Sequence, residues 1–466
     1  MKRNKTILGA FMIFLSLLLV SCTVKEERKT FAEAHDAFQT KLVKQDNDND
    51  QIPTPPEGVF DLVRYPSKVG DLSAYVSSDP GDGKKHPMII WVVGGWGNGI
   101  DNFVWSYPYW DNDQTASAFW DAGVLTMYPS FRGGNGNPGY YEALFGEVDD
   151  LVSAYEYAAS LPYVDPERIY LGGHSTGGTR ALLATEYTDK FRATFCFGPV
   201  DEIKYHNNTQ FTFDTSKKEE YVMRSPVYWL EDVKTPAFLI EGADGNSANL
   251  MAMKKKTSNE NIHCYIIEGA DHFSTLGPVT RLLAQKILAD TGETVNISIT
   301  QEELQEAMKS EPRKPVPIMT DYVNESLGLS FTCPFIWEAE EQRNDGELQI
   351  SLYSSNNEDN LWDMAGMNIF VYESEIPDYQ EDLGAYLEEA GYQRQNIEID
   401  GVSCLEADGI STNKNGNSFV NKVVLIPKDG KFIELNFFIH DSYGDSADSL
   451  FQEITDSIKL SEAAGE

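Results

Sequence analysis

The segment Gly173-His174-Ser175-Thr176-Gly177 contains the residue types best suited to chemistry in this sequence. It follows a predicted strand at 169–172 and precedes a predicted helix at 181–187. A serine flanked by small residues in this setting is typical of a sharp strand-to-helix turn, which exposes the hydroxyl and places the next N–H at a helix N-terminus. We therefore expect Ser175 to be a nucleophile and the Thr176 N–H to stabilise an oxyanion.

A serine needs a general base to activate it, and the base needs an acid to orient it. After Ser175 in the chain, Asp244 follows a predicted strand at 237–241 and His272 follows a predicted strand at 264–268. Catalytic groups gather where the carboxyl ends of parallel strands meet. The order Ser, acid, His therefore predicts His272 as the base and Asp244 as its acid.

Two neighbouring side chains are alternatives for these roles. His174 lies inside the turn, where we expect it to pack beside the nucleophile rather than act as the base. Asp271 adjoins His272, and neighbours in an extended segment point apart, which favours Asp244 as the acid.

A glycine-rich segment, Val-Gly-Gly-Trp-Gly-Asn-Gly at 93–99, follows a predicted strand at 88–92. Its glycines would let backbone N–H groups approach a developing oxyanion. The N–H groups of Gly95 and Trp96 are the predicted donors beside that of Thr176. A glycine turn without a catalytic role is the alternative.

The elements that must position these residues alternate between strand and helix over residues 58–300. This alternation predicts an α/β domain with a doubly wound, mostly parallel sheet. A helix and a proline-rich linker occupy 301–320. The pattern then changes, and Asp429-Gly430 between two alternating runs indicates a hairpin, so residues 321–466 are predicted to form a smaller α+β domain with an antiparallel sheet.

The first 22 residues have the pattern of a targeting segment. A basic start precedes an apolar run at 7–19 that is too short to span a membrane, as in a signal peptide. Leu19-Val20-Ser21-Cys22 matches the bacterial lipobox, whose cysteine is acylated; an ordinary signal peptide with a chance cysteine is the alternative. We expect an extracytoplasmic protein anchored by lipid on Cys22 to a bacterial membrane, with the outer membrane or cell surface favoured, and a polar tether at 23–57.

The charge of the chain limits its partners. The 466 residues include 37 Lys and Arg against 73 Asp and Glu, a formal charge of −36. Residues 321–466 hold 30 acidic and 7 basic residues, which gives −23. Such acidity argues against nucleic-acid binding. The expected partners are a small ester or peptide substrate, the membrane and an envelope protein at residues 321–466.

Three further patterns resemble ligand sites or disulfides. Gly134-Asn-Gly-Asn-Pro-Gly139 reads as a dinucleotide loop, but Pro138 interrupts it and no helix follows directly. Asp46-Asn-Asp-Asn-Asp50 has the spacing of a calcium loop, but Gln51 occupies the glycine position and prolines follow. We expect no cofactor and no metal site. Cys333 and Cys404 could pair, whereas Cys196 and Cys264 are expected to be buried thiols.

Residues 207–233 lie between two predicted strands, where a cap is commonly inserted. Phe211, Phe213, Tyr228 and Trp229 are the candidates for lining a substrate pocket. Packing of a small lid is the alternative.

Residues 88–300 resemble the prolyl oligopeptidase-like (dienelactone-hydrolase-like) α/β hydrolases. The resemblance rests on three motifs: Pro129-Ser-Phe-Arg-Gly133, Val164-Asp-Pro-Glu-Arg-Ile-Tyr-Leu-Gly-Gly-His-Ser-Thr-Gly-Gly178 and Asp271-His-Phe-Ser274. It implies Ser175 as nucleophile, Asp244 as acid and His272 as base, with Arg132 and Asp150 structural. Val93 departs from the family's His-Gly-Gly. Residues 321–466 are similar in pattern to PsbP-like lipoprotein domains, through Leu327-Gly-Leu-Ser-Phe331 at their start and Ile454-Thr-Asp-Ser-Ile-Lys-Leu460 at their end.

These observations predict a lipid-anchored serine hydrolase that cleaves an ester or amide bond through an acyl-enzyme. Two functions of another class remain open. One is an inactive hydrolase scaffold, and the other is an envelope interaction protein acting through its acidic C-terminal domain.

Overall fold

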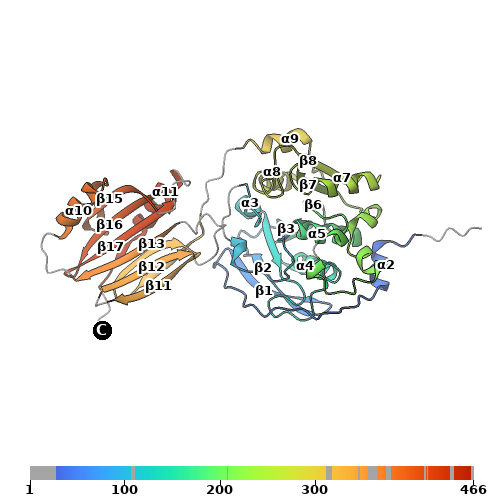
Figure 1. Ribbon diagram of the computed structural model, residues 1–466, viewed down its shortest axis with the longest axis horizontal. Coiled ribbons are helices and arrows are strands. Elements are labelled where there is room, and N and C mark those ends of the chain that lie inside the picture. Colours follow the sequence, from blue (N-terminus) through green and yellow to red (C-terminus); the bar gives the residue numbers. More distant parts are fainter. Residues whose placement is uncertain are drawn as a thin grey trace, which may run out of the picture.

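The computed structural model describes residues 28–105, 111–206, 208–310, 317–344, 347–354, 365–373, 379–413, 416, 418–440 and 445–462. An α/β domain comes first in the chain and an antiparallel β domain follows it (Figure 1). The predicted fold class is confirmed in both parts.

The α/β domain is built on an eight-stranded sheet with the order β1-β2-β4-β3-β5-β6-β7-β8. Strands β3 to β8 run parallel, and β1 and β2 join them as an antiparallel hairpin at one edge. The strands are β1 (Phe60–Ser67), β2 (Gly70–Ser77), β3 (His86–Val92), β4 (Leu125–Pro129), β5 (Val164–His174), β6 (Thr194–Phe197), β7 (Ala237–Gly242) and β8 (Ile262–Ile267).

Both faces of this sheet are buried under helices, which explains the unbroken apolar runs of its strands. In β3, Met88 and Ile90 pack into one core while Ile89 and Trp91 pack into the other. Helices α4 (Glu147–Ser160), α5 (Thr176–Tyr187) and α7 (Ser247–Lys256) contribute to the first core. Helices α3 (Ser117–Asp121), α8 (Leu276–Ala289) and α9 (Gln301–Ala307) contribute to the second.

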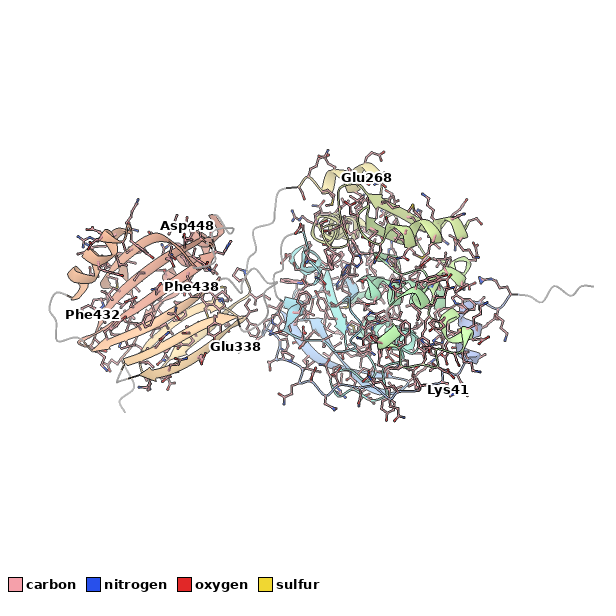
Figure 2. The ribbon with its side chains drawn as sticks, viewed as in Figure 1. Lys41, Glu268, Glu338, Phe432, Phe438 and Asp448 are labelled. Carbon is pink, nitrogen blue, oxygen red and sulfur yellow. The ribbon has the colours of Figure 1, made fainter. Side chains whose placement is uncertain are left out.

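The segment before the sheet packs on the α/β domain, so its described part is not the solvated tether that the sequence predicted. Helix α2 (Phe31–Ala37) begins with a capping box at Thr30 and Glu33, and Phe31 and His35 are buried. Farther along, Lys41 lies against the same domain (Figure 2), and its backbone N–H donates to Glu220 Oε1 at 2.7 Å. The aromatic ring of Phe31 explains the docking, because moving this ring into water would lose the free energy gained by burying its apolar surface.

The calcium-like and dinucleotide-like segments bind each other. The Asp48 N–H donates to the Gly133 carbonyl at 2.8 Å, and Asp48 Oδ1 accepts from the Asn135 N–H at 2.6 Å. The Gly136 N–H donates in turn to the Asp48 carbonyl at 2.8 Å. The two segments therefore stabilise each other, and the Asp48 carboxylate accepts a hydrogen bond from the backbone N–H of Asn135.

The C-terminal domain holds a seven-stranded antiparallel sheet with the order β11-β12-β13-β17-β16-β15-β14, beside a small sheet of the order β18-β10-β9. The predicted hairpin at Asp429-Gly430 is confirmed, because Lys428 pairs with Lys431 across it. Its elements are β9 (Met319–Asn324), β10 (Leu329–Pro334), β11 (Trp337–Asn344), β12 (Glu347–Ser354), β13 (Ala365–Glu373), α10 (Tyr379–Glu389), β14 (Gln393–Ile399), β15 (Val402–Thr412), β16 (Ser418–Lys428), β17 (Lys431–His440), α11 (Asp445–Ser457) and β18 (Lys459–Leu460).

The four described cysteines, Cys196, Cys264, Cys333 and Cys404, are free thiols, so the pairing of Cys333 with Cys404 that the sequence left open is not formed. Within the described residues, no helix is long and apolar enough to cross a membrane. Cys22 and the signal-like segment lie outside the described residues, and their assignment stays a prediction.

Candidate active site

Ser175 occupies a strained turn between β5 and α5. Its backbone has φ 56° and ψ −120°, a conformation that L-residues rarely adopt and that costs about 1–3 kcal/mol. The Ser175 N–H donates to the Phe197 carbonyl at 2.7 Å, which ties the turn to β6. A Cβ on Gly177 would overlap the Val92 carbonyl oxygen, so only glycine lets α5 begin this close to β3. The predicted strand–turn–helix arrangement around Ser175 is therefore present.

His272 is oriented by a carboxylate that the sequence did not predict. Its Nδ1 lies 2.8 Å from Oε2 of Glu241, a buried residue near the end of β7. Glu241 Oε1 accepts from the Gly242 N–H at 2.7 Å. With Nδ1–H donating to Glu241, the Nε2 atom of His272 is left as a proton acceptor.

Asp244, the predicted acid, is exposed, and in the described structure its carboxylate does not bond His272. Its backbone N–H donates to the Ala270 carbonyl at 3.0 Å, which places the residue in the turn after the strand. Glu241 takes the place predicted for Asp244 because the structure leaves room for its side chain beside the His272 ring. A Cβ on Gly198 would overlap both Glu241 Oε2 and the His272 ring, so a glycine there leaves room for this pair.

The loop of His272 has its own internal support from Asp271. Asp271 Oδ1 accepts from the N–H groups of Phe273 at 2.9 Å and Ser274 at 2.8 Å. These hydrogen bonds lower the pKa of Asp271. Asp271 thus stabilises the turn. Within the described structure it makes no hydrogen bond to the His272 ring, which agrees with the expectation that Asp271 is not the acid of the triad.

The Ser175 hydroxyl and the His272 ring are not hydrogen-bonded to each other in the described structure. Serine hydroxyls and their bases commonly come within bonding distance only once substrate is bound. The elbow and the His272 loop nevertheless adjoin, because the ring of His174 packs against that of His272.

The glycine-rich loop after β3 is anchored by side chains of α5. Thr176 Oγ1 donates to the Gly95 carbonyl, and Arg180 Nη2 donates to the Gly97 carbonyl at 3.2 Å and to Asn98 Oδ1 at 3.0 Å. In the described structure, the N–H groups of Gly95 and Trp96 have no hydrogen-bond acceptor. The first N–H of a helix, here that of Thr176, also lacks an intrahelical acceptor. The three predicted oxyanion donors thus lie on two segments, the start of α5 and the glycine-rich loop, which the side chains of Thr176 and Arg180 join.

A cavity of about 150 Å³ lies beside this loop. Gly94, Gly97 and Gly99 of this loop line it, and the rest of the lining includes Trp91, Tyr128, Phe131 and Arg180. None of the four predicted pocket residues lines this cavity.

The predicted pocket residues pack within the cap instead. Phe211 meets the Trp96 ring edge-on with centroids 5.6 Å apart, and Phe213 stacks on Phe211 at 5.0 Å. Phe213 is fully buried. Tyr228 donates its hydroxyl to Glu202 at 2.9 Å, and Trp229 donates Nε1–H to the Val222 carbonyl at 2.8 Å. The alternative interpretation, packing of a small lid, describes this arrangement better.

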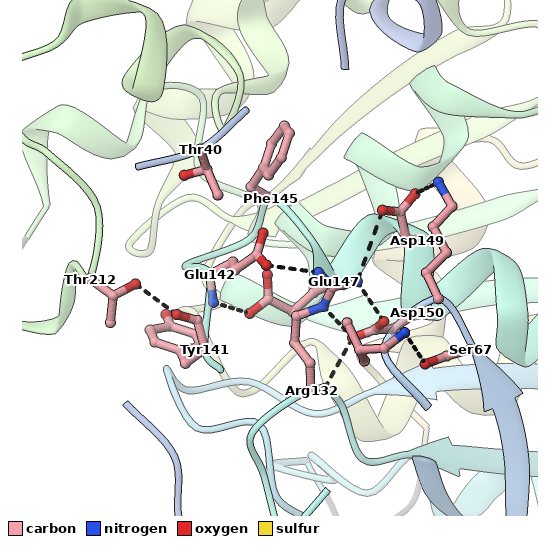
Figure 3. A network of polar contacts seen from close by, with 12 residues as sticks. Thr40, Ser67, Arg132, Tyr141, Glu142, Phe145, Glu147, Asp149, Asp150 and Thr212 are labelled. Atoms are coloured by element: carbon pink, nitrogen blue, oxygen red, sulfur yellow. Dashed lines mark hydrogen bonds and ion pairs between the residues drawn. The ribbon is translucent and has the colours of Figure 1, made fainter. Parts of the chain in front are cut away.

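A buried ionic network supports the loops behind the site (Figure 3). Arg132 donates through Nε and Nη2 to both oxygens of the buried Asp150, at 3.0 and 2.8 Å, and through Nη1 to Glu142 at 2.9 Å. Asn98 Nδ2 extends the network to Glu147 at 2.9 Å. Arg132 and Asp150 are therefore structural, in agreement with the expectation from the sequence.

Residues 110–287 match the sequence model of the prolyl oligopeptidase family. The matched segment contains the Ser175 elbow, Glu241 and His272. This segment of the protein is therefore similar to a family of peptidases.

Among solved structures, the chain is similar to dipeptidyl peptidase 4 of Porphyromonas gingivalis, with 19% identity and a TM-score of 0.41 over 49% of this chain and 35% of that chain. It is also similar to an esterase of Pyrobaculum calidifontis, with 15% identity and a TM-score of 0.38 over 52% of this chain and 87% of that chain. A third is the acylaminoacyl peptidase of Pyrococcus horikoshii (19%, 0.41, 53% and 43%). The chain thus spans about a third of the length of the peptidase from Porphyromonas gingivalis. No curated protein sequence matches it.

Proposed function

We propose that the protein is a serine hydrolase that cleaves ester or amide bonds through an acyl-enzyme, with Ser175 as nucleophile, His272 as general base and Glu241 as the acid that orients it. The observation that carries this proposal is the 2.8 Å contact between His272 Nδ1 and Glu241 Oε2 beside a strained serine elbow.

In the acylation step, Ser175 Oγ attacks the substrate carbonyl carbon while His272 Nε2 takes the hydroxyl proton. The imidazolium formed there is stabilised by Glu241, whose burial keeps the carboxylate away from competing water. Backbone N–H groups of Thr176 and of the Gly95–Trp96 loop receive the oxyanion. His272 then gives its proton to the leaving alcohol or amine.

In the second half, a water molecule replaces the leaving group. His272 Nε2 takes a proton from the water, whose oxygen attacks the acyl carbon, and returns that proton to Ser175 Oγ as the acid product leaves. All of the residues named in these steps belong to the α/β domain.

We further propose that the hydrolase works outside the cytoplasm, held to a bacterial membrane by lipid on Cys22. The basic start, the short apolar run and the lipobox-like Leu19-Val20-Ser21-Cys22 support this placement. Radiolabelled palmitate incorporation in cells, compared between the natural sequence and Cys22→Ala, tests it. Equal incorporation in the two proteins would refute lipidation at Cys22.

The catalytic proposal is tested by labelling the purified chain lacking its first 22 residues with a fluorophosphonate probe. We expect the natural sequence and Asp244→Asn to be labelled. Labelling should be abolished in Ser175→Ala and strongly slowed in Glu241→Gln. Folded natural protein that never labels would overturn the proposal. Loss of labelling in Asp244→Asn but not in Glu241→Gln would return the acid to Asp244.

A further inference from the structure

Two imidazole rings from different parts of the chain lie against each other beside the nucleophile. His174 ends β5 and directly precedes Ser175, whereas His272 lies in the loop after β8. Their ring centroids are 4.5 Å apart at an interplanar angle of 40°. His174 Nε2 lies 3.0 Å from the backbone carbonyl oxygen of His272. The residue before the nucleophile therefore holds the backbone of the base.

The hydrogen bond fixes the chemical state of His174. A carbonyl oxygen only accepts, so Nε2 must carry the proton. Nδ1 is buried and has no hydrogen-bond partner within the described structure. Burial and the neighbouring His272 lower the pKa of His174 to about 3. His174 is thus a neutral donor at any pH at which the enzyme would be assayed.

Other contacts hold the His272 loop in different ways. Glu241 fixes the ring through Nδ1, and the Asp271 carboxylate fixes the turn through two N–H groups of its own loop. Neither contact reaches β5. The hydrogen bond from His174 is the contact that joins the backbone of the base directly to the elbow.

We propose that His174 is a positioning residue for the hydrolysis reaction, because its Nε2–H ties the backbone of His272 to the elbow that carries Ser175. This inference rests on the proposed roles of Ser175 and His272. This positioning role requires His174 to be neutral. A cation at this position would oppose the imidazolium that forms on His272, 4.5 Å away, in each proton transfer.

The test compares His174→Gln with His174→Leu. The Gln amide nitrogen reaches about as far as imidazole Nε2 and keeps the donor, whereas Leu fills the space without one. The matched control is His263→Leu, since His263 lies on β8 and stacks on Phe238 away from the site. The measurements are the rate of fluorophosphonate labelling, and kcat and KM for p-nitrophenyl acetate, with thermal melting to confirm folding.

We expect the Leu variant to lose about 10- to 100-fold in labelling rate and kcat with KM unchanged, as for a small misplacement of the base. The Gln variant and the His263 control should stay within about threefold of the natural sequence, since each keeps the hydrogen bond to the His272 carbonyl.

Three results would overturn the proposal. A Leu variant that labels at the natural rate would show that the hydrogen bond is dispensable. Equal losses in the Gln and Leu variants would show that the donor is not what matters. Natural protein that never labels would remove the proposed function, and with it this inference. If the Leu variant fails to fold, His174→Asn takes its place, because its amide is too short to reach the carbonyl.

Discussion

Glu241 and His272 face each other across the ends of two neighbouring parallel strands, with the carboxylate Oε2 2.8 Å from the imidazole Nδ1. Glu241 is 1% exposed, so the pair is shielded from water and salt on the carboxylate side. When His272 takes up a proton during the reaction, the charge pair that forms keeps the strength that an exposed pair would lose to screening. The contact fixes the tautomer of the base as well as its orientation.

Replacing Glu241 by Gln should reduce kcat/KM for an activated ester by about 10³–10⁴-fold, because an amide can fix the wrong tautomer and cannot stabilise an imidazolium. Asp244→Asn is the matched control, since Asp244 is exposed and lies three residues away. It should retain activity within about twofold. Steady-state kinetics on both variants decides the matter, and a smaller loss in Glu241→Gln than in the control would contradict the assignment.

Thr176 should contribute through its side chain as well as its backbone. Thr176→Val removes the hydroxyl that donates to the Gly95 carbonyl and loosens the predicted oxyanion loop. We expect kcat to fall about three- to tenfold with little change in KM, the size of one neutral hydrogen bond. Thr176→Ser keeps the donor and should restore kcat. An unaffected Val variant would show that the loop does not depend on this bond.

His174 should make stability depend on pH. In the folded state its pKa is lowered to about 3, whereas an unfolded histidine titrates near 6.5. Between these values the unfolded chain binds a proton that the folded chain does not. The free energy of unfolding should therefore fall as pH decreases from about 6.5 towards 3, by up to about 1.4 kcal/mol per pH unit from this group.

Urea unfolding at several pH values measures this dependence. The acid slope should become smaller in His174→Gln, which has no titrating group at this position. The same slope in the variant and in the natural sequence would show that His174 titrates normally in the folded state.

The N-terminal segment should stabilise the catalytic domain. Phe31 is fully buried beside Tyr187 and Trp229, so Phe31→Ala should cost about 3–5 kcal/mol of unfolding free energy. Val43 belongs to the same segment but is 63% exposed, and Val43→Ala should cost less than about 0.5 kcal/mol. Equal effects in the two variants would mean that the segment is not docked in solution.

The sequence predicted the parts of the structure that depend on local patterning. Apolar runs such as 88–93 locate buried parallel strands, and the glycines around Ser175 locate the elbow. The choice of acid lies beyond such patterns, because Glu241 lies near the end of β7 and Asp244 lies in the turn directly after it, and only side-chain geometry separates them. Glycines at 198 and 245 were the available signal: a Cβ at Gly245 would lie 2.6 Å from Glu241 Oε1.

The N-terminal segment shows the same limit. Its polar composition predicted a tether, because nothing in the local pattern of residues states which surface of the domain the segment will cover. The Asp-rich run and the loop at 134–139 each resembled a ligand site when considered alone. In the folded chain, Asp48 binds the backbone of that loop, a long-range pairing that neither segment encodes locally.

If Cys22 carries the proposed lipid, the docked N-terminal segment also limits how far the catalytic domain can lie from the membrane. Arg28 is already bound to Asp232 at 2.7 Å, so the chain from Cys22 to the folded domain spans six residues. Fully extended, six residues cover about 20 Å, less than the diameter of the domain. With lipid on Cys22, the catalytic domain would therefore rest at the bilayer surface, and its substrates would have to come to the membrane to be cleaved.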